Sequence, residues 1–214
     1  MMRASHLTGL LAIILFAEPV AAQVSYPVDF RLGVFTGGTR RNLSVADVLG
    51  PKVTSSMRGI EAYLSPADGT GGIGGRILEG TFATQKFSLR EARVFIGERA
   101  FNATAGYGER TISGTDSSTT FSRAGVRSVV RIGGSGVLLS AEGSKYFPGD
   151  FSKKDANAPD KTNGWEAQTG IYFATPRIPA YVQLGYRTEY FSFGEHDEHM
   201  SGITFGVGLW LGAR

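Results

Sequence analysis

Apolar side chains alternate with small or polar ones along much of this chain. In residues 203–211 an apolar residue occupies every second position, and the positions between them carry Thr, Gly and Trp. Residues 180–191 follow the same rule. Because successive side chains of a strand point to opposite sides, a period of two predicts a β-strand with one apolar face and one polar face.

The same pattern recurs up the chain and predicts ten strands, with eight as the alternative count if the third to fifth are misassigned. The expected ranges are 27–35, 56–64, 72–82, 86–96, 100–107, 120–132, 137–146, 165–175, 180–191 and 203–211. Alternation is poor in 86–96, where Phe87 and Leu89 share parity with Glu91 and Arg93. A bulge near Arg90 would restore the register there.

Connections between the predicted strands alternate in character. We expect longer or more polar loops at 36–55 (with a helix-like piece at 44–49), 108–119, 147–164 and 192–201. The connections after the second, fourth, sixth and eighth strands are short and contain Gly or Pro. Short turns at one end and long loops at the other are typical of outer-membrane barrels, and an even strand count leaves both termini on the side of the short turns.

The N-terminus has the three parts of a secretion signal. Arg3 supplies the charge, residues 7–17 form an apolar run, and Val20-Ala21-Ala22 is a small-residue cleavage site. We therefore expect residues 1–22 to be a signal peptide and residues 23–214 to form one barrel domain. The run of 7–17 is shorter than the ~20 residues of a spanning helix, and no later segment is long enough, so membrane insertion would use strands.

The bulk composition agrees with an exported barrel. The 214 residues include 30 Gly and no Cys, and only 19% are charged, with a net charge of +3. Soluble domains usually carry about 25% charged residues. The mild positive charge and the lack of a basic run argue against a nucleic-acid partner.

Alternation alone does not tell which face lines the barrel. A soluble ligand-carrying barrel would point its apolar face inward, and this alternative stays open. The polar face here carries both signs of charge on neighbouring strands, which a small lumen can pair. The expected lumen charge ladder, to which we assign a structural role, comprises Arg123, Arg127, Arg131, Glu142, Glu166, Arg187 and Glu189.

Aromatic residues near the predicted strand ends favour the membrane arrangement. Such residues form girdles at the two membrane interfaces. They are Tyr26, Phe30, Phe35, Phe82, Phe101, Tyr107, Phe121, Tyr146, Trp165, Phe173, Tyr190 and Trp210. The sequence therefore predicts an all-β, antiparallel, up-and-down transmembrane β-barrel, with acyl chains outside and charges inside.

Ten strands enclose a narrow lumen that side chains largely fill, whereas wide channels belong to barrels of about 16 strands. A general porin is therefore not expected. The ladder can act as a structural plug, or alternatively it can gate a small solute or ion.

Together, the signal, the alternating strands, the charged polar face and the loop rhythm resemble the small outer-membrane β-barrel proteins of the OmpA or OmpX type. The resemblance covers residues 23–214 in architecture and rests on no short motif. Members usually end in Phe or Trp, whereas this chain ends Gly212-Ala213-Arg214. The resemblance implies an outer-membrane location in a Gram-negative-type bacterium. It also implies contact with outer-membrane lipid and lipopolysaccharide, and insertion by the barrel assembly machinery.

Candidate chemistry is sparse. Glu195-His196-Asp197-Glu198-His199 contains metal-ligand types, but in a loop such a cluster is usually solvated. His199-Met200-Ser201 has the His-x-Ser spacing of outer-membrane lipid A deacylases, in which His activates Ser. The Asn and the downstream acid of that family are absent. We therefore expect no metal, no cofactor and no enzymatic activity. The expected function is a structural, surface-contact or minor small-solute transport role, with a lipid-directed barrel enzyme or a soluble secreted binding barrel as alternatives.

Overall fold

The computed structural model describes most of the chain from Val28 onward. The predicted signal peptide, residues 1–22, lies outside the described residues, as does Tyr26. The described ranges are 28–45, 48–50, 52–66, 69–82, 85–98, 100–112, 117–133, 136–148, 162–174, 178–193 and 196–212. Among these residues there is no helix long and apolar enough to cross a membrane.

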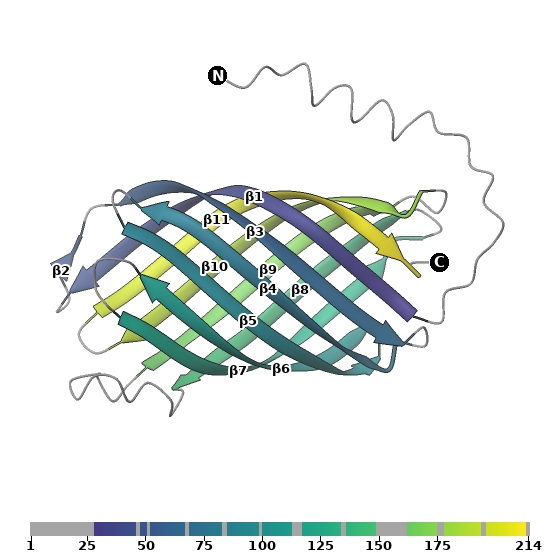
Figure 1. Cartoon of the computed structure of the whole chain (residues 1–214), viewed down its shortest axis with the longest axis horizontal. Coiled ribbons are helices and arrows are strands. Elements are labelled where there is room, and N and C mark those ends of the chain that lie inside the picture. Colours follow the sequence, from purple (N-terminus) through teal and green to yellow (C-terminus); the bar gives the residue numbers. More distant parts are fainter. Residues whose placement is uncertain are drawn as a thin grey trace, which may run out of the picture.

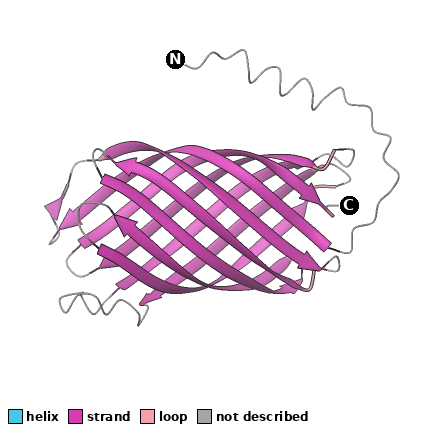
Figure 2. Ribbon diagram, in the orientation of Figure 1, coloured by secondary structure: helices cyan, strands magenta, loops and turns pink. Residues whose placement is uncertain are grey.

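Ten long strands form one antiparallel sheet that closes on itself (Figure 1, Figure 2). Each strand pairs with the next along the chain, and β11 pairs with β1 to complete an up-and-down barrel. A two-residue strand, β2, pairs with the last two residues of β1. The strands are β1 (Val28–Val45), β2 (Val48–Leu49), β3 (Val53–Pro66), β4 (Gly71–Phe82), β5 (Gln85–Glu98), β6 (Phe101–Ile112), β7 (Ser117–Arg131), β8 (Val137–Pro148), β9 (Thr162–Ala174), β10 (Ala180–Phe193) and β11 (His196–Leu211). The predicted fold class and the count of ten are confirmed.

The register around the barrel sets its tilt. Following paired residues once around from Phe30 leads back to β1 at Asn42, twelve residues further on. The path runs through Leu64, Ile73, Val94, Ala105, Ala124, Lys145, Trp165, Tyr190 and His199. With ~3.3 Å per residue and ~4.8 Å between strands, this shift corresponds to a tilt of about 40° from the barrel axis. Figure 1 shows this slant.

The two ends of the barrel differ. At one end, which we call the terminal end, β1 begins and β11 ends, and β3 is joined to β4, β5 to β6, β7 to β8 and β9 to β10. At the opposite end, the loop end, β1 is joined through β2 to β3, and β8 is joined to β9 by residues 149–161. The expected placement of both chain ends of the barrel on one side therefore agrees with the strand order.

Several strands continue beyond the expected boundaries toward the loop end. β1 runs to Val45 and β2 follows at Val48–Leu49, so the predicted helix-like piece at 44–49 is wrong. β6 reaches Ile112 and β11 begins at His196, which shortens the loops expected at 108–119 and 192–201. Polar residues can form a strand instead of a loop when each backbone N–H and C=O group finds a partner on the neighbouring strand.

The expected bulge near Arg90 is also wrong. β5 pairs with β4 without interruption from Gln85 to Ile96, and with β6 from Phe87 to Glu98. Phe87, Leu89, Glu91 and Arg93 all point inward and are buried. Because the lumen holds apolar side chains as well as charged ones, mixed parity in β5 needs no change of register.

The barrel is inverted relative to a soluble protein. Large apolar side chains are exposed on its outer wall, including Val34, Phe101, Leu184 and Ile203, which is 60% exposed. Buried polar and charged side chains instead line the interior. The buried charged residues are Asp29, Arg31, Arg41, Arg76, Glu91, Arg93, Arg110, Arg123, Glu166, Arg187, Glu189 and Glu198.

Five of the aromatic residues assigned to interfacial girdles point into the lumen instead. They are Phe35, Phe82, Phe121, Tyr146 and Trp210, of which all but Phe35 are fully buried. Phe101, Tyr107, Trp165 and Phe173 do lie exposed on the outer wall. Proximity to a strand end does not decide the face; the parity of the position within its strand does.

Inward glycines make room for these rings. A Cβ atom added to Gly108 would lie 2.5 Å from the ring of Phe121, and one added to Gly33 would collide with the hydroxyl of Tyr181. A narrow barrel cannot hold large side chains at every inward position, so rings lie against bare backbone on neighbouring strands. Part of the high glycine content has this steric cause.

Candidate functional site: the charged lumen

A network of arginines and carboxylates crosses the middle of the lumen. Its members, which we call the central network, come from six strands. They are Arg76, Glu91, Arg93, Arg123, Glu142, Glu166, Arg187 and Glu189.

Glu166 is the centre of this network. Its Oε1 accepts a hydrogen bond from Arg76 Nη1 at 2.7 Å, and its Oε2 accepts one from Arg76 Nη2 at 2.5 Å. Arg187 Nη2 and the Tyr146 hydroxyl also donate to Oε2, at 3.0 Å and 2.5 Å. Arg187 in turn donates to Glu189 Oε2 at 2.9 Å. A fully buried carboxylate with two guanidinium partners and a hydroxyl partner is well compensated for its lost hydration.

Two further carboxylates complete the network. Glu91 accepts from Arg76 Nη2 at 3.0 Å and from Arg123 Nη1 at 2.7 Å. Glu142 Oε1 accepts from Arg93 Nη1 at 2.8 Å and from Arg123 Nη2 at 2.7 Å. Arg123 therefore joins the two carboxylates, and charge is balanced through shared partners rather than isolated pairs.

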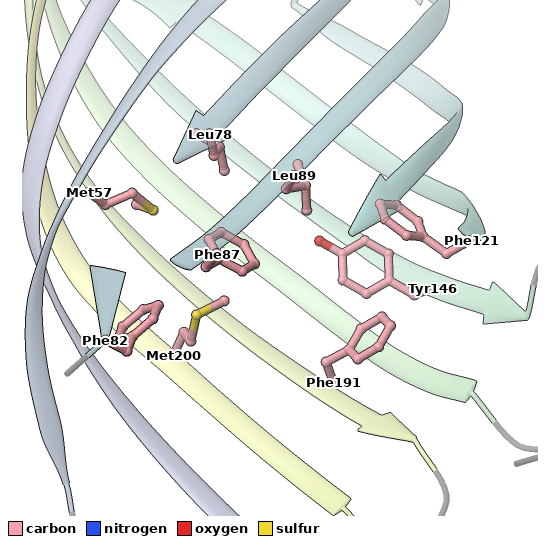
Figure 3. Packing of buried hydrophobic residues seen from close by; sticks show 9 residues of the cluster. All are labelled: Met57, Leu78, Phe82, Phe87, Leu89, Phe121, Tyr146, Phe191 and Met200. Atoms are coloured by element: carbon pink, nitrogen blue, oxygen red, sulfur yellow. The ribbon is translucent and has the colours of Figure 1, made fainter. Parts of the chain in front are cut away.

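An apolar layer, whose side chains are drawn in Figure 3, lies on the loop side of the central network. This loop-side layer consists of Met57, Leu78, Phe82, Phe87, Leu89, Phe121, Tyr146, Phe191 and Met200. Leu78, Leu89 and Phe121 have no exposed surface. The ring centres of Phe121 and Tyr146 lie 4.8 Å apart, within the range of favourable aromatic contact. The side chains of this layer come from seven strands and pack against one another between the network and the loop end.

A second ionic group borders this layer at the loop end. Glu198 pairs with Arg41 and accepts a hydrogen bond from Arg110 Nη2 at 2.5 Å. Arg41 also donates through Nη1 to Gln85 at 2.9 Å. The Arg110 guanidinium lies 4.5 Å from the ring centre of Phe191, so cations contact the faces of the layer's aromatic rings.

The terminal half of the lumen is built differently. Val129, Leu138, Tyr172, Tyr181 and Trp210 form a smaller terminal layer on one side of the barrel. Beside it is a cavity of about 40 Å³, which we call the terminal cavity. Its lining includes Arg31, Glu61, Tyr63, Arg93, Phe95, Arg127, Ser140, Glu142, Gln168 and Tyr172.

Most of the predicted ladder meets in one place, and two members do not. Arg123, Glu142, Glu166, Arg187 and Glu189 all belong to the central network. Arg127 lines the terminal cavity, where its guanidinium lies against two aromatic rings. Arg131 is exposed at the terminal end of β7.

The predicted ladder omits five of the seven arginines that are buried in the described residues, namely Arg31, Arg41, Arg76, Arg93 and Arg110. Arg76 lies in β4, where Gly-rich alternation is weak, and Arg93 lies in β5, where a bulge was expected. Arg41, Arg110 and Glu198 fall in segments that were assigned to loops. The parity of these positions, extended through the polar strand ends, would have placed them in the lumen.

The histidine-rich segment splits between two faces. Glu198 is buried in the lumen, whereas His199 is exposed on the outer wall. In the described part of the chain no group of three metal-ligand side chains comes together. His199 Nε2 is 3.0 Å from Thr188 Oγ1, and Ser201 is on the same outer face two residues further along β11. The hydrogen bond that the His199 ring makes is thus to Thr188.

No protein-family model and no curated protein matches this chain. Among solved structures, the chain is similar to Neisserial surface protein A, with 14% identity, a TM-score of 0.41, and 83% of this chain and 96% of that chain covered. It is also similar to the translocator domain of the autotransporter NalP from Neisseria meningitidis, with 12% identity, a TM-score of 0.32 and 96% of each chain covered. A mutant of TodX, a monoaromatic hydrocarbon channel, matches with 7% identity and a TM-score of 0.38, covering 87% of this chain and 90% of that one. At these values the likenesses carry no argument about what this chain does.

Proposed function

We propose that this chain is an integral outer-membrane β-barrel protein with a plugged lumen, whose role is structural or lies in surface contact through its loop end. The observation that carries the proposal is the inversion of the barrel, with large apolar side chains outside and paired charges inside. In water, so many exposed apolar groups on one continuous wall would drive association. In a bilayer the same wall is solvated by acyl chains.

The dimensions of the wall fit a membrane. On β10, the outward side chains from Ala180 to Tyr190 carry no charge, and the same holds on β11 from Ser201 to Leu211. At ~3.3 Å per residue and a tilt of about 40°, each stretch rises about 25 Å, which is the height of the apolar band of outer-membrane barrels.

Outward charges support an orientation. Arg58, Glu79, Arg90, Glu109 and Lys145 are exposed on the outer wall toward the loop end. Charged side chains at this height would meet the phosphates and cations of lipopolysaccharide headgroups. We therefore place the loop end outside the cell and the terminal end in the periplasm. Insertion would depend on the barrel assembly machinery.

The filled lumen favours a structural role over transport. The central network and the loop-side layer occupy successive levels of the barrel, and the terminal cavity of about 40 Å³ has room for only a few water molecules. Ten strands enclose a narrow lumen, and large buried side chains at both levels oppose an aqueous path like that of a wide porin. The second candidate weighed from the sequence, a lipid-directed enzyme at His199 and Ser201, gains no support from the bond of His199 to Thr188.

The proposal is tested on membranes and on purified protein. We expect the chain to be extracted only by detergent, to migrate faster on gels before heating than after, and to give no steady conductance in planar bilayers. A monomer that stays folded in detergent-free buffer would overturn the membrane location. Stable single-channel currents would overturn the plug. An altered lipid A profile that reverts in His199→Ala cells would replace the structural role with an enzymatic one.

A further inference from the structure

Two guanidinium groups in the terminal cavity donate no hydrogen bond to a carboxylate of the described residues, whereas every arginine of the central network donates at least one. Arg31 is 8% exposed, and its Nε is a buried donor without a hydrogen-bond partner. The Nε atoms of the central-network arginines also lack a hydrogen-bond partner, but those guanidiniums donate to carboxylates through their Nη atoms. Arg31 forms one long ion pair, in which Oδ1 of Asp29 is 4.0 Å from Nε, and the same oxygen accepts the indole N–H of Trp210 at 2.7 Å. Arg127 makes no hydrogen bond to a carboxylate of the described residues. Glu142, directly opposite Arg127 in the register, accepts from Arg93 and Arg123 instead.

Both guanidiniums lie against the same ring. The Cζ atom of Arg31 is 4.1 Å from the ring centre of Tyr63, and that of Arg127 is 5.1 Å from it. The two cations are therefore no more than about 9 Å apart, since both distances are measured to one point. Contact with aromatic faces offsets part of the cost of burying a cation, but it leaves the N–H donors unused.

The inward side chains of the described strands show the same surplus of positive charge. Between the two mouths, the inward side chains of the described strands include eight arginines and seven carboxylates. The arginines are Arg31, Arg41, Arg76, Arg93, Arg110, Arg123, Arg127 and Arg187; the acids are Asp29, Glu61, Glu91, Glu142, Glu166, Glu189 and Glu198. Unpaired buried charge is costly, so the surplus cation favours a counter-ion.

We propose that the terminal cavity is a binding site for one compact monovalent anion, held by Arg31 and Arg127 beside Tyr63. The cavity, at about 40 Å³, limits the ligand to a halide or a small oxyanion rather than a sugar or nucleotide phosphate. Guanidinium groups suit this task because they stay charged and offer several donors in a plane. Arg93 and Glu142 also line the cavity, but they are paired with each other, so Glu61 is the carboxylate that opposes the anion by like charge.

Trp210 provides a reporter for occupancy. The chain has two tryptophans, and Trp165 is exposed on the outer wall, so Trp165→Phe leaves Trp210 as the single emitter. Arg31 Cζ lies 4.7 Å from the Trp210 ring centre, so a heavy anion at Arg31 quenches Trp210 by contact. The experiment titrates potassium iodide into the refolded full chain in a nonionic detergent, with potassium gluconate holding the ionic strength constant and gel mobility before heating confirming the fold.

We expect saturable quenching by iodide, competition by chloride, nitrate or formate, and only linear quenching by neutral acrylamide. Arg127→Gln removes a charged donor and should weaken the apparent iodide affinity by about tenfold or more. Glu61→Gln removes the opposing charge and should tighten it by about threefold to tenfold. Arg90→Gln removes one positive charge from the outer wall, as Arg127→Gln does from the cavity. It should leave the apparent iodide affinity within about twofold of the parent value.

Iodide affinity is expected to fall in Arg127→Gln and to rise in Glu61→Gln, and these opposite changes separate a binding site from a purely structural role. A variant that merely loosens the barrel raises access to iodide and acrylamide alike. Linear iodide quenching in the parent would overturn the proposal, and so would equal affinities in the parent and Glu61→Gln. If Arg127→Gln does not fold, Glu61→Gln decides alone. A barrel that folds in detergent yet binds no iodide leaves the proposed membrane function standing, so the two failures are distinguishable.

Discussion

The two halves of the lumen obey the same parity rule but solve the problem of buried charge in different ways. In the loop half, each carboxylate of the central network has at least one guanidinium partner, and an apolar layer covers the network. In the terminal half, Arg31 and Arg127 lie against aromatic rings and line a cavity. The difference teaches that charged lumen residues are not one structural class. Arginines that donate to carboxylates hold the strands together, whereas arginines that donate to none are the ones we propose for anion binding.

The largest expected effect comes from breaking the saturated half. Glu166→Gln removes the charge that Arg76 and Arg187 share, leaving two buried cations short of a partner. Removing one partner of a buried pair typically costs about 3–5 kcal/mol. Urea unfolding of the protein in detergent micelles or vesicles measures the free energy of unfolding.

The matched control for this change is Glu79→Gln on the outer wall. The Glu79 side chain is 53% exposed and pairs with Arg58. If both Glu→Gln variants lowered the free energy of unfolding equally, the central network would not be a stabilising plug.

The second prediction compares the loss of unfolding free energy when the same substitution, Leu→Ala, is made in each of the two apolar layers. Leu78→Ala deletes a fully buried side chain from the loop-side layer, where the void stays dry; we expect a loss of about 3–5 kcal/mol. Leu138→Ala deletes the same group from the terminal layer, which adjoins the terminal cavity through Tyr172. Water can enter that void, so we expect a smaller loss, about 2–3 kcal/mol. Unfolding midpoints measured side by side test the order, and a reversed order would mean that the loop half is the wetter one.

Sequence reasoning reached the barrel and five of the eight residues of the central network, but not the division of the lumen into halves. Alternation placed Arg123, Glu166 and Arg187 on the inner face because parity is a local property of each strand. It could not tell which of them would share partners, because Glu166 meets Arg76 across the lumen, 90 residues away in the chain. Nor could alternation separate Arg127 from Arg123, because both share parity on β7. Only the axial position within the tilted barrel distinguishes Arg123, which donates to carboxylates, from Arg127, which does not.

A third prediction contrasts the outer wall with the lumen. Leu184→Arg places a charge in the uncharged stretch of β10, and near the middle of a bilayer this costs about 2–4 kcal/mol. Thr54→Arg, exposed at the loop-end start of β3, should cost about 0–1 kcal/mol. The measurement is unfolding in lipid vesicles, repeated in detergent. Equal costs at the two positions would place the apolar wall somewhere other than a bilayer.

The smallest effect on stability is expected for the exposed ion pair of Arg58 and Glu79 on the outer wall. Arg58 Nη2 lies 3.0 Å from Glu79 Oε2, a distance matching those inside the lumen, but the two side chains are 79% and 53% exposed. Solvent and salt screen such a pair, so a double-mutant cycle of Arg58→Ala and Glu79→Ala should give a coupling of about 0–1 kcal/mol that shrinks as salt is added. A cycle of Arg187→Ala and Glu166→Ala should couple several times more strongly and resist salt, because neither partner is accessible to ions. Similar geometry with unequal coupling would establish that enclosure, rather than contact distance, gives the lumen charges their stabilising effect; equal couplings in the two cycles would contradict that account.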